Sequence, residues 1–324
     1  MQKPINSRYA IIDLGSNTFH LLIIEKQSDT IRTLVKEQIP AKIAMAGINQ
    51  GIITEEAIER ALKVLHFFRQ QIDEQRVPLE NSIALGTSAI RNAKNGTEFC
   101  KTIEKEMGIV IEIISGDREA ELIYEGVRRA LNLGTVPSLI MDIGGGSVEF
   151  IICHATRIFW KQSFEIGGQR LLEKFLHTDP ISSSAIQRMN NYFQEQLLPL
   201  VNAAHQYAPQ TLVGSSGSFD TLVDMDYMHR LDHLPDPEKT DFNYPLEEFY
   251  RAYELFTSLN HDERMTIPGM IELRVDMIVP AAVLIAHVLK SLNIRQIRCS
   301  TFALKEGIMA WVLKEASTGY TELN

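Results

Sequence analysis

The stretch MDIGGGSVEF (141–150) places an acid, three glycines, a hydroxyl and a second acid between two apolar runs. Glycine lets the backbone approach a ligand and turn its N–H groups toward it, and a neighbouring hydroxyl adds one more donor. This combination is typical of a phosphate cradle. The alternative is a turn that only closes a hairpin, but three successive glycines cost backbone entropy on folding, which favours binding. The candidate phosphate-binding residues are Gly144, Gly145, Gly146 and Ser147.

A related turn occurs earlier in the chain, in DLGSNT (13–18). Taken alone, this turn is best explained as part of a hairpin, because Gly and Asn are ordinary turn residues. It shares with the first motif an Asp followed two residues later by a Gly, and two such turns facing each other would hold a phosphate chain from both sides. The pairing adds four candidate phosphate-binding residues, Gly15, Ser16, Asn17 and Thr18.

The acids of the two motifs cannot bind phosphate directly, because like charges repel. They suit Mg²⁺ or its bound waters, so that the cation joins carboxylate to phosphate. We therefore expect Mg²⁺ as the cofactor, with other divalent cations able to replace it. The candidate metal-associated residues are Asp13, Asp142 and Glu149.

A third turn, in LVGSSGSFDTL (212–222), joins an apolar run to the expected start of a helix. N–H groups at a helix N-terminus favour anions, so this turn could meet phosphate or a nucleotide. A well-capped helix, with Ser216 or Ser218 as the cap, explains the same residues, and both explanations stay open. The candidates in this turn are Gly214, Ser215, Ser216 and Gly217.

The segment ISGDREAELIY offers three carboxylates, on Asp117, Glu119 and Glu121. Acids in a first helical turn usually complement the helix dipole. Glu119, however, follows a strand end and a Ser-Gly turn, where active sites of α/β proteins gather, and a carboxylate there could deprotonate an attacking water. Arg91, in TSAIRNAKN, is a nearby cation suited to bidentate contact with phosphate.

The elements that must position these residues alternate between strand and helix. Apolar runs predict strands at 9–14, 19–25, 82–85 and 109–114, the first two joined as an antiparallel hairpin. Helical spacing predicts a helix capped by Thr54, another at 97–107 and a third from Asp117 onward. Residues 131–137 carry Gly and Pro and are the candidate linker.

After this linker the arrangement of strand, glycine turn and strand starts again, which predicts two similar domains. We expect an N-terminal domain over 1–132 and a C-terminal domain over 133–324, with the helix from about 304 able to pack back on the first. The second half predicts helices at 184–204, 219–229, 246–259, 274–292 and 304–314. Pro280 should kink its helix or begin a new segment, and 229–245 reads as a polar surface loop.

Composition narrows the function classes. With 324 residues, 45% hydrophobic and 23% charged, the chain is an ordinary soluble protein of two-domain size, and no apolar run is long enough to span a membrane. A net charge of −9 disfavours nucleic acid as a partner. Three widely spaced cysteines suggest neither a disulfide framework nor a zinc site and fit the cytoplasm. The serine-hydrolase, zinc-protease and Walker motifs are all absent from the sequence.

Seven segments together resemble the exopolyphosphatase and guanosine pentaphosphate phosphohydrolase family. In chain order they are DLGSNTFHLLI, GTSAIRNAKN, EIISGDREAELIYEGV, MDIGGGSVEF, VGSSGS, RVDMIVPAA and STFALKEGI. The resemblance covers nearly the whole chain and is closest to the short form, without the additional C-terminal helical domain of longer members. No single motif is specific, because D-x-G turns also occur in actins, sugar kinases and related ATPases.

The resemblance implies two actin-like (ribonuclease H-like) α/β domains with the active site between them, and Mg²⁺-dependent hydrolysis of a terminal phosphoanhydride. It implies that Glu119 is the catalytic base, that Asp142 and Glu149 are metal-associated, and that Arg91 and the glycine turns contact phosphate. Four positions depart from the usual family pattern. Val148 stands in place of Thr, Ala281 and Ala303 in place of glycines, and Lys305 in place of Arg.

The substrate expected first is inorganic polyphosphate, and guanosine pentaphosphate is the alternative that the sequence does not exclude. An actin-like ATPase or sugar kinase would instead bind adenosine at the VGSSGS turn. A non-catalytic sensor would bind guanosine tetraphosphate or pentaphosphate without releasing phosphate. A homodimer is the assembly considered, because dimers are the commonest oligomers.

Overall fold

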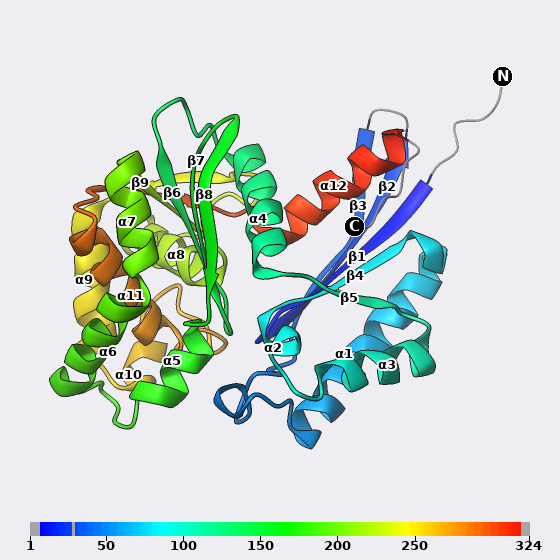
Figure 1. Ribbon diagram of the computed structural model, residues 1–324, viewed down its shortest axis with the longest axis horizontal. Coiled ribbons are helices and arrows are strands. Elements are labelled where there is room, and N and C mark those ends of the chain that lie inside the picture. Colours follow the sequence, from blue (N-terminus) through cyan, green and yellow to red (C-terminus); the bar gives the residue numbers. More distant parts are fainter. Residues whose placement is uncertain (1–6, 28–29, 319–324) are drawn as a thin grey trace. The chain divides into compact units, whose positions relative to one another are not determined.

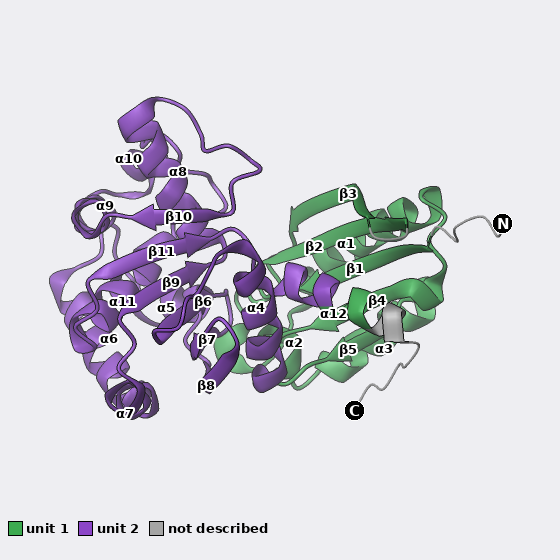
Figure 2. Cartoon of the chain, turned by 90° about the horizontal axis from the view of Figure 1, so that it is seen from above, with its two compact units in different colours: residues 1–115, 311–324 green, residues 116–310 purple. Residues whose placement is uncertain are grey.

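The computed structural model describes residues 7–27 and 30–318 (Figure 1). The chain forms two compact units, residues 1–115 together with 311–324, and residues 116–310 (Figure 2). The units divide ahead of α4 (Gly116–Ala130), whereas the sequence placed the division at 132/133. α4 belongs with the second unit because it packs on two strands of that unit's sheet.

The sheet of the first unit has the strand order β3-β2-β1-β4-β5 in the described part of the chain. Its strands are β1 (Ser7–Leu14), β2 (Thr18–Gln27), β3 (Thr30–Pro40), β4 (Ser82–Gly86) and β5 (Ile111–Ile113). β1 and β2 form the predicted antiparallel hairpin, and β4 and β5 run parallel to β1. β3 was not predicted, because it is an edge strand with mostly exposed or half-buried side chains.

The helices of the first unit are α1 (Glu55–Glu74), α2 (Ser88–Arg91) and α3 (Gly96–Met107), with short 3₁₀ turns at Ile48–Gln50 and Leu79–Asn81. Thr54 caps α1 as predicted, and its side chain accepts a hydrogen bond from the Ala57 N–H. α1 and α3 cover one face of the sheet (Figure 1), where Phe68 and Phe99 are buried in a core shared with the strands.

The sheet of the second unit has the order β10-β11-β9-β6-β7-β8 within residues 116–310. Its strands are β6 (Ser138–Ile143), β7 (Val148–His154), β8 (Arg157–Phe164), β9 (Thr211–Ser215), β10 (Asp241–Tyr244) and β11 (Gln296–Ser300). β6, β7 and β8 form an antiparallel meander, while β9 and β11 run parallel to β6. Taken from β8 to β11, this order matches that of the first sheet. The chain therefore has two actin-like α/β units, as predicted.

Helices lie on both faces of the second sheet; Figure 1 shows α4 on one face and α5, α6 and α7 on the other. α12 (Leu304–Thr318) begins in the second unit, which ends at Ala310, and its remaining residues belong to the first unit. The other helices of the second unit are α5 (Gly168–Phe175), α6 (Ser183–Gln196), α7 (Leu198–Tyr207), α8 (Gly217–Leu231), α9 (Leu246–Ser258), α10 (His261–Met265) and α11 (Ile278–Ser291). Phe150, Phe193 and Phe256 are fully buried in the core that these elements share.

Three expectations for the second half are corrected. The helix expected over 184–204 is two helices, because Pro199 suits the first turn of α7 and not a helix interior. The helix expected from 274 begins at Ile278, so that Pro280 falls in the first turn of α11. The segment 229–245 is not loop throughout, because β10 pairs antiparallel with β11. In the described residues, no helix is both long and apolar enough to cross a membrane.

Candidate active site

The glycine turn of the first unit is held by its carbonyl groups. The carbonyl of Asn17 accepts N–H bonds from Ala41 and Lys42, at 3.0 and 2.8 Å, and that of Ser16 accepts one from Ala44 at 2.9 Å. Because C=O and N–H point in opposite directions across a trans peptide, the N–H groups of Asn17 and Thr18 face away from this support. Gly15 is required here, since an added Cβ would lie 2.8 Å from the Thr18 carbonyl oxygen.

Two side chains of this turn, those of Asn17 and Thr18, have hydrogen-bond donors without an acceptor among the described residues. Asn17 and Thr18 are 7% and 5% exposed, and within residues 7–27 and 30–318 the Asn17 Nδ2 and Thr18 Oγ1 atoms have no hydrogen-bond partner. Buried polar groups are normally hydrogen-bonded to protein or ordered water, so these donors are available to a bound phosphate. The same sheet edge carries Asp13, whose register partner on β4 is Leu85, and Arg91 at the end of α2, which donates to the Ile114 carbonyl at 3.1 Å.

The glycine turn of the second unit is built in the same way, with the start of α5 as its support. The carbonyls of Gly144, Gly145 and Gly146 accept hydrogen bonds from the N–H groups of Gly168, Gln169 and Gly167, at 2.9, 2.9 and 3.1 Å. The peptide geometry then turns the N–H groups of the three following residues away from α5. Those residues are Gly145, Gly146 and Ser147, and successive backbone N–H groups of this kind can bind an anion.

Asp142 joins this turn to the third one. Its carboxylate accepts hydrogen bonds from the Ser215 hydroxyl at 2.6 Å and the Ser216 hydroxyl at 2.8 Å. Ser216 occupies the N-cap position of α8 with φ +70°, yet its side chain makes no capping bond because its hydroxyl serves Asp142. The third turn therefore belongs to the same site and is not merely a capped helix. Burial raises the pKa of Asp142, and the two hydroxyls partly offset that shift.

Glu149 lies directly across from Asp142, because β6 and β7 pair these two positions. The Ser163 hydroxyl donates to Glu149 Oε1 at 2.7 Å. Burial raises the pKa of Glu149 well above its ordinary value, and repulsion from Glu119 and Asp142 raises it further. All three carboxylates are thus buried in the second unit, with exposures of 6%, 6% and 1% for Glu119, Asp142 and Glu149.

The structure separates Glu119 from the two other acids at the start of α4. Lys161 of β8 lies 2.8 Å from Asp117 and 3.3 Å from Glu121, whose side chains are 70% and 43% exposed. Those two acids form surface ion pairs. Glu119 is buried and its negative charge raises the pKa of Glu149, so it is the candidate of this segment for chemistry.

Residues 22–316 match the family model described as the Ppx/GppA phosphatase family. The chain belongs to this family. The crystal structure of an exopolyphosphatase from Cytophaga hutchinsonii is 44% identical to it, with a TM-score of 0.91 and coverage of 97% of this chain and 99% of that one. The family predicted from the sequence motifs is therefore confirmed.

Two further proteins are similar to this chain. A guanosine-5′-triphosphate,3′-diphosphate pyrophosphatase from Photobacterium profundum is 28% identical over 95% of this chain, and the chain spans 60% of that relative's length. The crystal structure of the Aquifex aeolicus Ppx/GppA family member is 24% identical, with a TM-score of 0.77 over 97% of this chain and 99% of that one. It shares the fold.

Sequence reasoning did not assign Arg274 and Lys305, two cations of the second unit, to the site. Gly217 allows the guanidinium of Arg274 to lie against it, because an added Cβ would overlap that group. The positive charges of Arg274 and Lys305 both lower the pKa of Asp142 and of Asp220. Arg274 lies in the RVDMIVPAA segment, and its place beside the third turn could not be foreseen because two predicted helices lie between Gly217 and Arg274 in the sequence.

The residues of the second unit fit a bound Mg²⁺. The described residues contain no group of three or more His, Cys, Asp or Glu side chains arranged to hold a metal. Mg²⁺, however, commonly takes one or two carboxylates and completes its shell with water and phosphate oxygens. Asp142 and Glu149 supply such a pair; burial raises the pKa of both carboxyls, and a cation would offset the cost of burying their charges.

Asp220, in the first turn of α8, makes a testable contribution to stability. Burial raises the pKa of its carboxyl from 3.8 to about 7. Between those values the folded state keeps a proton that the unfolded state loses, so the free energy of unfolding falls as the pH rises. At about 1.4 kcal/mol per pKa unit, the upper limit of this loss is about 4 kcal/mol.

We expect Asp220→Asn to gain stability relative to the wild type between pH 5 and pH 7.5. Urea unfolding at both pH values, without divalent cations, measures the difference. An equal pH dependence in the two proteins would contradict the raised pKa.

Proposed function

We propose that this protein hydrolyses the terminal phosphoanhydride bond of inorganic polyphosphate. The observation that carries the proposal is the buried group of Glu119, Asp142 and Glu149 beside a glycine turn whose N–H groups face away from its support. The 44% identity to an exopolyphosphatase over nearly the full chain supports it. Guanosine pentaphosphate is the second candidate substrate, favoured by the pyrophosphatase from Photobacterium profundum.

Binding of an anionic chain to a protein of net charge −9 requires local donors and cations. In the second unit these are the N–H groups of Gly145, Gly146 and Ser147, together with Arg274 against Gly217. In the first unit we assign phosphate contacts to the turn at Gly15 and Ser16, with its Asn17 and Thr18 donors, and to Arg91. Each of these backbone N–H groups belongs to a peptide group whose carbonyl is already hydrogen-bonded. The N–H groups therefore lose little freedom when phosphate binds, which favours accurate positioning.

Mg²⁺ would be held by Asp142 and Glu149, and Asp13 is the further metal-associated residue that we propose in the first unit. When bound, the cation would neutralise charge on the phosphate oxygens. Ser215, Ser216 and Ser163 orient the two carboxylates of the second unit by donating to them, at 2.6, 2.8 and 2.7 Å. Such supporting hydrogen bonds keep a charged side chain in one position.

The chemical step is attack by water on the terminal phosphorus. Glu119 accepts a proton from the water as its oxygen forms a bond to phosphorus. The bond between that phosphorus and the bridging oxygen breaks in line with the attack, and the bridging oxygen leaves with the shortened chain. One inorganic phosphate is released for each water consumed.

The substrate is tested by measuring phosphate release, with Mg²⁺, from short polyphosphate, long polyphosphate, guanosine pentaphosphate and ATP. Release from polyphosphate at the highest kcat/KM is the expected result, and preference for guanosine pentaphosphate would select the second candidate. Turnover of ATP alone would contradict both. A cytoplasmic location and a homodimer stay predictions.

Replacing Asp142 tests the metal assignment. We expect Asp142→Ala to raise the Mg²⁺ concentration for half-maximal activity about 10–100-fold and to lower the rate, because the variant removes one charged metal contact. The measurement is a Mg²⁺ titration of phosphate release after EDTA treatment. Glu121→Gln is the matched control, since Glu121 lies at the surface beside Lys161. An unchanged Mg²⁺ dependence in Asp142→Ala would remove Asp142 from the metal site.

A further inference from the structure

A buried arginine, Arg264 of α10, ties together three segments of the second unit. Its side chain is 2% exposed, and buried arginines require partners for their N–H donors. Nη1 donates to Asp179 Oδ1 at 2.7 Å and to the Leu259 carbonyl at 2.6 Å. Nε donates to the Val275 carbonyl at 3.0 Å, and Nη2 lies 3.3 Å from Asp276 Oδ1.

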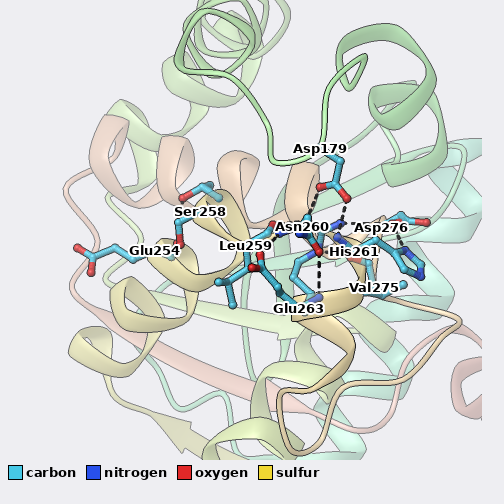
Figure 3. Close-up of polar contacts among 11 residues, drawn as sticks. Asp179, Glu254, Ser258, Leu259, Asn260, His261, Glu263, Val275 and Asp276 are labelled. Carbon is cyan, nitrogen blue, oxygen red and sulfur yellow. Dashed lines mark hydrogen bonds and ion pairs between the residues drawn. The ribbon is translucent and has the colours of Figure 1, made fainter.

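The short helix that carries Arg264 is itself held firmly. Asn260 and Glu263 form a capping box, in which each side chain bonds the other residue's backbone N–H, at 3.0 and 2.8 Å (Figure 3). His261 adds two bonds to the same partners of Arg264. The backbone N–H of His261 donates to Asp179 at 2.5 Å, and its ring Nδ1 lies 2.8 Å from Asp276 (Figure 3).

Arg274 directly precedes Val275, the residue whose carbonyl Arg264 binds. Residues 266–277 form successive turns ahead of α11, so their backbone is not fixed by a regular helix or strand. The Arg274 N–H donates to the Ile271 carbonyl at 2.9 Å, and its carbonyl accepts the Ile278 N–H at 2.9 Å. Arg264 binds the carbonyl of the next residue, Val275, and so restrains the backbone that directly follows Arg274.

We infer that Arg264 is a positioning residue, which through Val275 and Asp276 holds the Arg274 guanidinium against Gly217, beside Asp142, Ser215 and Ser216. Arg264 acts through the backbone of its neighbour and touches none of the site residues itself in the contacts described above. The inference rests on the proposed function, because it assigns Arg274 to phosphate. Lysine keeps the charge of Arg264 but cannot reproduce a planar fork that reaches four acceptors.

A double-mutant cycle with Arg274 tests this inference. We expect Arg264→Lys to lower kcat/KM for polyphosphate about tenfold in the wild type, but to change it less than twofold in an Arg274→Ala background. A positioning role predicts this non-additivity, whereas a general loss of folded protein would lower activity by the same factor in both backgrounds. Equal factors would therefore overturn the inference. Asp276→Asn, at a half-exposed side chain, repeats the cycle without removing the buried arginine.

The matched control is Arg298→Lys, because Arg298 likewise joins a carboxylate, Asp241, and a carbonyl, Asn132, but on β11. Its effect should be the same with and without Arg274→Ala.

The cycle is also measured as the Kd of tripolyphosphate with Mg²⁺, which does not depend on turnover. An inactive wild type that still shows the coupling in Kd would contradict the proposed function alone. Absence of coupling in Kd, or absence of tripolyphosphate binding, would overturn the role of Arg264.

Discussion

Glu119→Gln is expected to lower kcat about 10²–10⁴-fold while leaving the affinity for polyphosphate largely intact. Glutamine keeps the size of the side chain but cannot accept a proton from water. The loss should appear in kcat and not in KM, because Glu119 acts on the attacking water. Steady-state phosphate release, with a separate binding measurement on the variant, distinguishes the two parameters.

The control for this prediction lies two residues further along the same helix. Glu121→Gln removes a carboxylate that pairs with Lys161 at the surface, so we expect activity close to that of the wild type. Wild-type kcat in Glu119→Gln would remove Glu119 from the role of base. Equal losses in the two variants would point to the charge or stability of α4 and not to a base.

Gly167→Ala is expected to lower kcat/KM about 100-fold through the glycine turn of the second unit. An added Cβ would lie 2.5 Å from the carbonyl carbons of both Gly145 and Gly146 and 2.6 Å from the Gly145 oxygen. Since these are backbone atoms, the turn itself must shift. A displacement of about 1 Å in a positioning group can cost about 10² in rate. Phosphate release and the melting temperature are measured together, to separate loss of activity from loss of folded protein.

The neighbouring glycine supplies a matched control. An added Cβ at Gly168 would meet its nearest atom, Met277 Cβ, at 3.5 Å, which is ordinary van der Waals contact, and the Gly168 N–H to Gly144 would remain. We therefore expect a much smaller loss in Gly168→Ala. Similar activities for the two variants would show that the turn tolerates the displacement and that its N–H groups do not set the rate.

The sequence predicted both glycine turns because their motifs are local and repeated, and the matching sheet orders confirm the repeat. Its position after a strand end made Glu119 a candidate, and the family resemblance selected it, but the sequence did not show what sets Asp117 and Glu121 apart. Asp117 and Glu121 are occupied by ion pairs with Lys161. This lysine lies on β8, 40 or more residues further along the chain. Contacts of this kind follow from topology and not from spacing.

The supports of the site were missed for the same reason. Gly167 and the first turn of α5 carry the glycine turn, yet the sequence predicted no helix over 168–175. Arg264 and Arg274 become informative only once burial and packing are known, since most arginines are exposed. The break at Pro199, by contrast, could have been predicted from the sequence. Proline suits a first helical turn and should have divided the helix expected over 184–204.

The most direct test of the proposed mechanism is hydrolysis of polyphosphate in water enriched in ¹⁸O, followed by mass analysis of both products. Attack of water on the terminal phosphorus places one ¹⁸O in the released inorganic phosphate and none in the shortened chain. Label in the shortened chain would show attack at an inner phosphorus and would contradict the account.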